Sequence, residues 1–258
     1  MKKHKLYTGD SIEIMKSLKP DFVDIIVTSP PYNVGTNYSV YNDDLPEHDY
    51  LAWTERWIMA ARRVMKDSGS LFFVIGSTPA KADLQFKVAE RVSSVMELQN
   101  AIIWVKSIAI DSIQYGHYQP INSARFLSNN FELILHLTKE KTINLNKTTI
   151  GVPYVDESNL KRWKTDGSNL HDRGNVWFIP YKTRRVKNTH PCEFPVELPE
   201  MCIKLHGYNE ETIVMDPFMG TGATGIASQK LGCRFIGIDI DENYVRIANK
   251  RISEVAGS

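Results

Sequence analysis

Apolar residues follow two alternating patterns along the chain. Short continuous apolar runs predict buried strands over 22–27, 71–75, 101–105, 131–138, 212–215 and 234–238. Apolar residues at helical spacing predict helices over 11–18, 49–65, 81–95 and 194–205, from the turn at 220–222 to 231, and over 242–255. Strands that alternate with helices indicate a doubly wound α/β fold, with a mostly parallel sheet covered on both faces.

One stretch breaks this alternation. Between about Lys139 and Trp177 the periodicity fades, and Asn, Asp, Gly and Lys become frequent. We therefore expect residues 139–175 to form an inserted, loop-rich segment, and residues 1–138 and 176–258 to form one α/β domain around it.

Composition narrows the class of protein. The chain has 258 residues, 42% hydrophobic and 24% charged, which is typical of a globular domain with a buried core. No run of 18 apolar residues and no secretory leader is recognisable, so we expect a protein of the prokaryotic cytoplasm without a membrane anchor. Three scattered cysteines argue against a disulfide framework or a CxxC metal site. The net charge of +1 neither indicates nor excludes a nucleic-acid partner.

A glycine-rich turn follows the strand at 212–215. Residues 220–225 spell G-x-G-x-x-G, which lets a ligand approach the backbone at a helix N-terminus, and Asp239 ends the next strand, where it could accept ribose hydroxyls. The alternative is a tight structural turn. Asp216 adds a carboxylate that would repel a pyrophosphate but suits a cationic sulfonium. Only 33 residues follow Gly225, too few for a second mononucleotide-binding half. The turn favours S-adenosylmethionine over NAD.

A second turn, Ser29-Pro30-Pro31-Tyr32, directly follows the first buried strand. Two prolines fix the backbone and leave carbonyls that can only accept hydrogen bonds. The Pro30 carbonyl and the Ser29 oxygen could accept the two protons of an exocyclic amine, while Tyr32 stacks on the heterocycle. The alternative is a proline-terminated strand with a surface tyrosine.

Together the two turns resemble the signatures of the amino-methylating DNA methyltransferases. Ser29–Tyr32 matches the family's [Ser/Asp/Asn]-Pro-Pro-[Tyr/Phe/Trp], and Asp216–Gly222 matches its Asp-Pro-Phe-x-Gly-x-Gly. Their order resembles the permuted beta group, as do Gly9-Asp10, Arg63–Lys66 before Gly69–Leu71, and His190-Pro191 with Phe194-Pro195. The resemblance covers nearly the whole chain outside the polar insert. It implies a Rossmann-like methyltransferase sheet with circularly permuted motif order.

The resemblance also implies roles for single residues. The catalytic turn would be Ser29, Pro30, Pro31 and Tyr32. Asp10 would contact the adenine of S-adenosylmethionine, Asp239 its ribose, and Asp216 its amino group. The turn formed by Pro217, Phe218, Gly220, Thr221 and Gly222 would surround the methionine portion, and His190-Pro191 would start the helix that closes the far side. The family often has Thr-Thr where Ala223-Thr224 stands, and Glu where Asp239 stands. No metal is implied.

The first residue of the catalytic turn bears on the target base. Ser in the first position of the catalytic turn usually accompanies N4-cytosine enzymes of the family, so Ser29 favours cytosine over the alternative, N6 of adenine. Methylation of cytosine C5 would need a cysteine nucleophile, and Cys192 follows a proline as such enzymes require. However, Cys192 lies in the segment that matches the cofactor-side helix, so an inert thiol is the favoured interpretation.

A basic stretch indicates where DNA would bind. Residues 161–187 contain eight basic and two acidic residues, a local charge of +6, interleaved with Trp163, His171, Trp177 and Tyr181. The predicted DNA contacts are Lys161, Arg162, Lys164, Arg184 and Arg185. In the family the insert selects the DNA sequence; a solvated charged face is the alternative. Residues 115–119 would border the flipped-base pocket or form a surface loop.

The partner implied is double-stranded DNA. A cognate restriction endonuclease that acts separately is a possible further partner. The sequence leaves open whether such a partner exists and whether the protein is a monomer or a homodimer. An NAD oxidoreductase and a nucleotide-binding DNA-binding protein without chemistry are the remaining alternatives from other functional classes.

Overall fold

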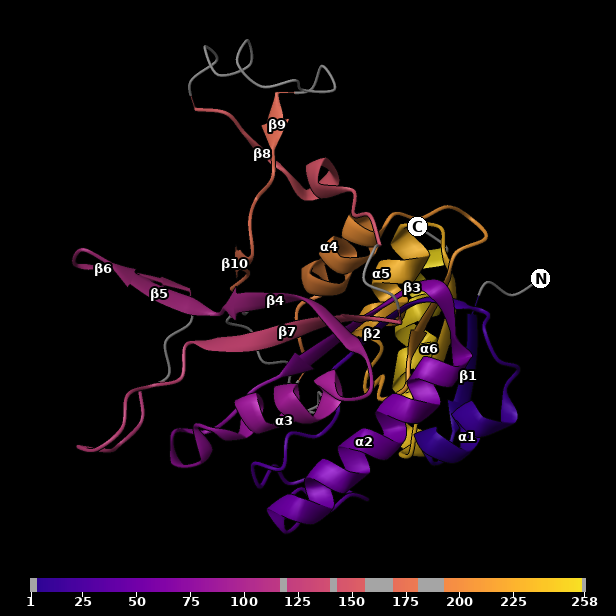
Figure 1. Ribbon diagram of the computed structural model, residues 1–258, viewed down its shortest axis with the longest axis horizontal. Coiled ribbons are helices and arrows are strands. Elements are labelled where there is room, and N and C mark those ends of the chain that lie inside the picture. Colours follow the sequence, from indigo (N-terminus) through magenta and orange to yellow (C-terminus); the bar gives the residue numbers. More distant parts are fainter. Residues whose placement is uncertain (1–3, 117–119, 140–142, 156–168, 181–192, 257–258) are drawn as a thin grey trace.

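The computed structural model describes residues 4–116, 120–139, 143–155, 169–180 and 193–256 (Figure 1). Its strands are β1 (His4–Thr8), β2 (Val23–Thr28), β3 (Met65–Ile75), β4 (Glu97–Val105), β5 (Ser107–Ile110), β6 (Ile113–Gly116), β7 (Phe131–Thr138), β8 (Val152–Pro153), β9 (Leu170–His171), β10 (Val176–Phe178), β11 (Ile213–Asp216) and β12 (Arg234–Asp239). Its α-helices are α1 (Ser11–Ser17), α2 (Glu47–Val64), α3 (Leu84–Ser93), α4 (Glu197–His206), α5 (Ala223–Lys230) and α6 (Glu242–Ala256), with short 3₁₀ turns at Pro79–Lys81 and Lys147–Ile150.

The central sheet has the strand order β1-β12-β11-β2-β3-β7-β4-β10. Neighbouring strands are parallel except that β7 runs antiparallel to both β3 and β4. Helices α1, α2 and α3 pack on one face of the sheet, and α4, α5 and α6 pack on the other (Figure 1). The prediction of a doubly wound, mostly parallel sheet is confirmed.

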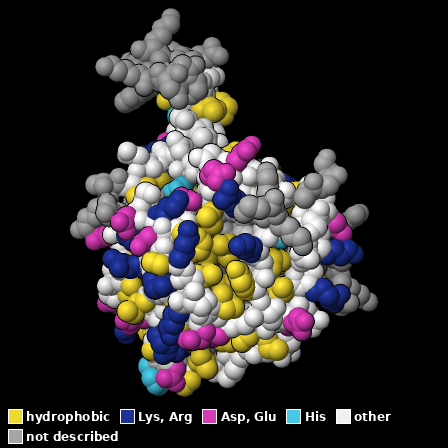
Figure 2. Space-filling model, turned by 90° about the vertical axis from the view of Figure 1, so that its right-hand side faces the viewer, with side chains coloured by type: hydrophobic (Ala, Val, Ile, Leu, Met, Phe, Trp, Pro, Cys, Tyr) yellow, Lys and Arg dark blue, Asp and Glu magenta, His cyan; other side chains and the backbone are white. Residues whose placement is uncertain are grey.

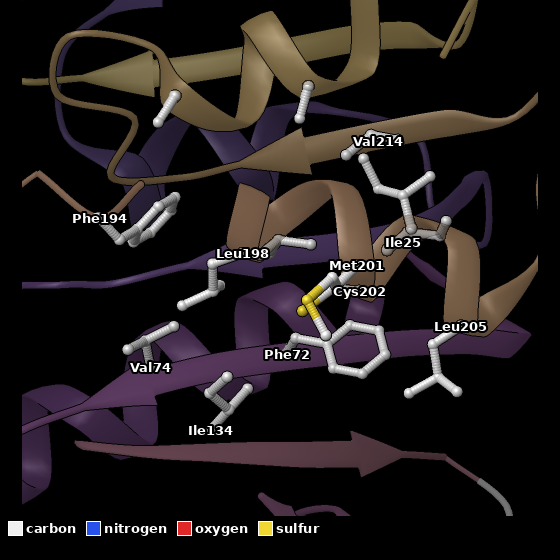
Figure 3. Close-up of a cluster of buried hydrophobic side chains, with 14 of the residues drawn as sticks. Ile25, Phe72, Val74, Ile134, Phe194, Leu198, Met201, Cys202, Leu205 and Val214 are labelled. Carbon is white, nitrogen blue, oxygen red and sulfur yellow. The ribbon is translucent and has the colours of Figure 1, made fainter. Parts of the chain in front are cut away.

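The middle strands are buried on both faces, which explains their continuous apolar runs. Along β3, Phe72 and Val74 point toward the α4 side, where Leu198 and Met201 meet them (Figure 3). Phe73 points to the opposite face and meets the edge of the Trp57 ring at 5.0 Å between centroids. Each such side chain contributes about 1.5–3 kcal/mol by burial.

Several elements differ from the sequence-based expectation. β1 was not predicted, because it lies at the sheet edge and none of its five residues is fully buried. The β5–β6 hairpin was not predicted either, although Ile108, Ile110, Ile113 and Tyr115 alternate with polar or small residues. β10 extends the sheet beyond β4.

The segment expected to be an insert is described only in part. Residues 147–155 and 169–171 form a 3₁₀ turn and the short β8–β9 pair, which projects from the body of the molecule (Figure 1). Residues 140–142 and 156–168 lie outside the described part of the chain. The division into a core domain and an insert stays a prediction.

Charges on the face shown in Figure 2 are mixed in sign. Lys and Arg side chains are interspersed with Asp and Glu around a hydrophobic area. This arrangement agrees with the net charge of +1 and gives that face no continuous positive field.

A polar network is buried between β3, β4, β7 and α4. The amide of Asn100 donates to Nδ1 of His136 (3.0 Å), and Nε2 of His136 lies 2.9 Å from the Ser70 hydroxyl. That hydroxyl also lies 2.9 Å from Nδ1 of His206. Because an amide nitrogen can only donate, His136 accepts at Nδ1 and is therefore neutral in this network. Burial, with His206 nearby, lowers the pKa of His136 to about 4.

This lowered pKa predicts a loss of stability in acid. In the unfolded chain His136 protonates near pH 6.5, whereas in the folded chain it stays neutral until about pH 4. Its contribution is thus complete above pH 6.5 and is lost as the pH falls toward 4, by roughly 3 kcal/mol in all. We expect the difference in unfolding free energy between wild type and His136→Gln to shrink by that amount over this range, measured by urea denaturation at each pH. A constant difference would contradict the assignment.

Candidate active site

Four loops meet at the carboxyl edge of the sheet, where neighbouring parallel strands end together. They follow β1, β2, β11 and β12, and they carry both of the turns identified in the sequence. Between them lies an open pocket with about 690 Å³ of free space, its solvent-filled mouth included. Its lining consists of Gly9, Asp10, Ser11, Ser29, Pro31, Tyr38, Ser39, Val40, Tyr41, Trp53, Pro217, Phe218, Asp239, Ile240, Asp241 and Tyr244.

The pocket combines carboxylates with aromatic rings. Asp10, Asp239 and Asp241 supply the carboxylates. Trp53 lies between Tyr41 and Phe218, with ring centroids 5.8 and 5.5 Å away. Aromatic faces and carboxylates attract a cation and offer stacking surface to a purine, whereas a pyrophosphate would be repelled. The residues therefore fit a cationic nucleoside such as S-adenosylmethionine.

Asp239 stands at the end of β12 and forms part of the pocket wall. Its carboxylate accepts hydrogen bonds from the backbone N–H groups of Gly220 and Asp241, each at 2.9 Å. Burial raises the pKa of Asp239, while these two amides act in the opposite direction. Each carboxylate oxygen can accept a further hydrogen bond, so the group is both oriented by the glycine turn and able to bind a ligand hydroxyl.

Asp216, for which the resemblance implies a place near the amino group of S-adenosylmethionine, is not part of the pocket lining. Its side chain is 1% exposed and lies below the pocket wall. The hydroxyls of Thr28 and Thr224 donate to its two oxygens at 2.7 and 2.8 Å, and the Phe218 N–H donates at 3.1 Å. Burial raises its pKa to about 6. Asp216 thus joins the end of β2 to the turn after β11, which fixes the two signature turns relative to each other.

The rest of the glycine turn packs against α6. Gly222 has φ +88°, and a Cβ there would lie 2.9 Å from Cβ of Ala248, so the close approach is to the helix. The Arg251 guanidinium donates to the backbone and side-chain oxygens of Thr221 at 2.8 and 2.6 Å. Gly220, Thr221 and Gly222 are buried behind the wall that Pro217 and Phe218 form.

The Ser-Pro-Pro-Tyr turn lies beside the same pocket. Ser29 and Pro31 line it, and Pro30 is buried. The Tyr50 hydroxyl donates to the carbonyl of Pro31 at 2.9 Å, so α2 fixes the exit of the turn.

Tyr32 points away from this pocket toward β7. Its hydroxyl donates to Glu132 at 3.0 Å, and the other oxygen of Glu132 pairs with the Lys106 ammonium at 2.9 Å. The ring lies so close to Gly76 that a Cβ there would be 3.0 Å from it. Sequence reasoning missed Glu132, although a lone acid inside the apolar run of β7 is a usable signal.

Sequence reasoning also missed a loop that lines part of the pocket. Tyr38, Ser39 and Tyr41 belong to a segment read only as an acidic loop, yet they line the pocket. The Ser39 hydroxyl donates to the Asp241 carboxylate, and this bond holds the pKa of Asp241 below its usual range. These contacts join segments about 200 residues apart, which periodicity cannot reveal.

Several predicted site residues lie outside the described part of the chain. They are His190, Pro191, Cys192, Lys161, Arg162, Lys164, Arg184 and Arg185. Among the described residues, Cys202 and Cys233 are buried free thiols, and no group of His, Cys, Asp or Glu is arranged to hold a metal. In that same part of the chain, none of the helices combines the length and apolar character needed to cross a membrane.

Comparison with known proteins identifies the family. The sequence model of the N6/N4 DNA methylases matches residues 23–250. The type II methyltransferase M.HpaI of Haemophilus parainfluenzae is 29% identical over 96% of this chain and 74% of its own length. The DNA adenine methyltransferase YhdJ of Escherichia coli is 26% identical over 95% of this chain and 81% of its own.

Solved structures show the same fold. The cytosine-N4-specific PvuII DNA methyltransferase superimposes with a TM-score of 0.74 at 18% identity, over 98% of this chain and 91% of that one. The M1.HpyAVI–SAM complex gives a TM-score of 0.61 at 24% identity, over 96% and 99%. This chain belongs to the N6/N4 DNA methylase family.

Proposed function

We propose that this DNA methylase transfers the methyl group of S-adenosylmethionine to the N4 amine of a cytosine extruded from double-stranded DNA. The observation that carries the proposal is the position of Ser29, which directly follows β2 and forms part of the wall of the acidic, aromatic pocket. That position supports the proposal that the turn accepts hydrogen bonds from the amine beside the bound cofactor. S-adenosylmethionine supplies an activated methyl group, so the protein has to provide binding and alignment.

The protein's part in the reaction follows from these positions. Ser29 and the Pro30 carbonyl accept hydrogen bonds from the N–H groups of the exocyclic amine. These hydrogen bonds localise the nitrogen lone pair for attack on the methyl group. A nitrogen–carbon bond forms as the sulfur–carbon bond breaks, and one amine proton leaves through the acceptor turn to water. Tyr32 stacks on the base, which must leave the duplex to reach this edge of the sheet.

Cytosine is preferred because Ser occupies the first position of the turn, and the similarity to the cytosine-N4-specific PvuII enzyme agrees with it. N6 of adenine is the second candidate, favoured by the similarity to the adenine methyltransferase YhdJ. Both reactions require the same acceptors and the same cofactor pocket.

The product decides between them. The wild-type chain is expressed in a bacterial strain without DNA methyltransferases, and its DNA is digested to nucleosides and analysed by mass spectrometry. We expect N4-methylcytosine from wild type and from Cys192→Ala, because no thiolate attack is involved. N6-methyladenine would move the assignment to the second candidate. 5-Methylcytosine that disappears in Cys192→Ala would overturn the mechanism.

The remaining roles are proposals that extend this one. Residues 139–175 select the DNA sequence, and the basic residues of 161–187 contact phosphates. His190-Pro191 closes the cofactor pocket. A separate restriction endonuclease that cleaves the unmethylated sequence would be the functional counterpart.

A further inference from the structure

The loop of residues 120–130 exposes an apolar tip at the carboxyl edge of the sheet. Phe126 is 44% and Leu127 91% exposed, and the Arg125 guanidinium lies over the Phe126 ring at 5.7 Å from its centroid. In Figure 1 the loop reaches outward at the lower left, on the side toward which β4 ends. Two adjacent large apolar side chains beside a cation form a candidate contact surface.

The base of this loop is attached to the catalytic turn. The Asn129 side chain donates to the carbonyl of Ser77 at 2.6 Å, one residue after the glycine that contacts Tyr32. The Lys106 N–H donates to the carbonyl of Asn130 at 2.8 Å. Two residues after Asn130, Glu132 holds both the Lys106 ammonium and the Tyr32 hydroxyl. The base of the loop is therefore held by the same group of contacts, around Lys106 and Glu132, that fixes the position of Tyr32.

The tip itself has a defined shape. The Ser123 hydroxyl accepts from the N–H groups of Arg125 and Phe126 at 3.1 and 3.3 Å, which bends the chain just before the apolar pair. A bent, preorganised tip loses less conformational entropy on insertion than a free loop would.

We propose that Phe126 and Leu127 enter the base stack of the duplex next to the extruded base, while Arg125 contacts a flanking phosphate. The inference rests on the proposed function. Extrusion leaves a gap in the stack. DNA-bending proteins show that Phe, Leu or Ile side chains can insert between base steps. The attachment of the loop to the catalytic turn fixes the distance between this gap and the base pocket.

Duplex DNA suits the tip better than a second copy of the chain does. A stable protein interface buries about 800 Å² on each partner, whereas an aromatic side chain supplies about 150–250 Å². Two side chains cannot supply that area, whereas insertion between base steps needs only one or two apolar side chains. Arg125 also complements a phosphate.

The test uses the wild-type recognition sequence, read from the methylated sites in host DNA. The double variant Phe126→Ala/Leu127→Ala is compared with Met59→Ala, which truncates an exposed side chain on α2. One duplex is fully matched, and a second carries an abasic site opposite the target base, so that the base is already unpaired. A third has 2-aminopurine in place of the target base, and its fluorescence reports extrusion.

On the matched duplex we expect the double variant to lose on the order of tenfold in kcat/KM. On the 2-aminopurine duplex it should lose the fluorescence increase that wild type gives at saturating protein. On the abasic duplex its kcat/KM should return to near the wild-type value. Met59→Ala should match wild type throughout.

Three results would overturn the inference. The first is an unchanged rate on the matched duplex. The second is an equal loss on both duplexes, which would indicate a general contact with DNA. The third is a change of oligomeric state in sedimentation without any effect on extrusion, which would indicate self-association. Wild-type protein that methylates none of the duplexes would instead refute the proposed function, and this inference with it.

Discussion

Replacing Tyr32 by Ala should lower the methylation rate about 10- to 100-fold and leave the affinity for S-adenosylmethionine within twofold of wild type. The ring lies against Gly76 and Glu132, away from the wall formed by Ser29 and Pro31, so its loss leaves the cofactor pocket intact. Stacking of a base on an aromatic ring contributes about 1–3 kcal/mol, a factor of roughly 5 to 150, which brackets that range of rates. Single-turnover kinetics on DNA and calorimetric titration with the cofactor measure the two quantities separately.

Two further variants separate the ring from its hydroxyl. Tyr32→Phe keeps the stacking surface and leaves Glu132 paired with Lys106, so we expect only a severalfold decrease. Glu132→Gln keeps the shape of the contact but weakens the pairing with Lys106, and it should resemble Tyr32→Phe. If Tyr32→Ala were fully active, the turn would be structural and the base would bind elsewhere. If Tyr32→Phe were as inactive as Tyr32→Ala, the hydroxyl rather than the ring would carry the effect.

The sequence predicts the sheet well because its central strands are buried on both faces. Runs such as 22–27 and 131–138 have no other plausible location in a globular protein, and both are strands of the sheet. The sequence also predicts that the two signature turns lie close together, because the carboxyl ends of parallel strands meet at one edge of the sheet. The edge strand β1 and the β5–β6 hairpin carry only weak alternation, and isolated short patterns of that kind are ambiguous.

The direction in which a side chain points was harder to predict. Asp216 and Asp239 both follow strands at the carboxyl edge, so spacing alone suggests that both face the ligand. The structure separates them through the hydroxyls of Thr28 and Thr224, which turn Asp216 inward. Thr28 is 188 residues away in the chain, so only the assembled sheet reveals the contact.

The two aspartates should therefore respond differently to removal. Asp216→Ala removes the acceptor of the Thr28 hydroxyl and of the Phe218 N–H, whereas the Thr224 hydroxyl keeps the Val27 carbonyl at 3.3 Å. We therefore expect a loss of about 2–4 kcal/mol in unfolding free energy. Asp239→Ala should weaken S-adenosylmethionine binding by about 1.5–3 kcal/mol, roughly ten- to a hundredfold in Kd. Its stability loss should be smaller, because its carboxylate borders the open pocket. Urea denaturation and calorimetry give both values for each variant.

Asn at each position serves as the matched control. Asp216→Asn keeps one oxygen as an acceptor and should recover a part of the stability that Asp216→Ala loses. Asp239→Asn keeps the size of the side chain but removes its charge, so cofactor binding should stay weak while the fold is retained. If Asp216→Ala were as stable as wild type and bound cofactor as weakly as Asp239→Ala, Asp216 would face the ligand after all. Removal of a buried carboxylate costs stability because its hydrogen-bond donors lose their acceptor. The unfolding free energy of Asp216→Ala therefore tells whether Asp216 is buried or faces the ligand.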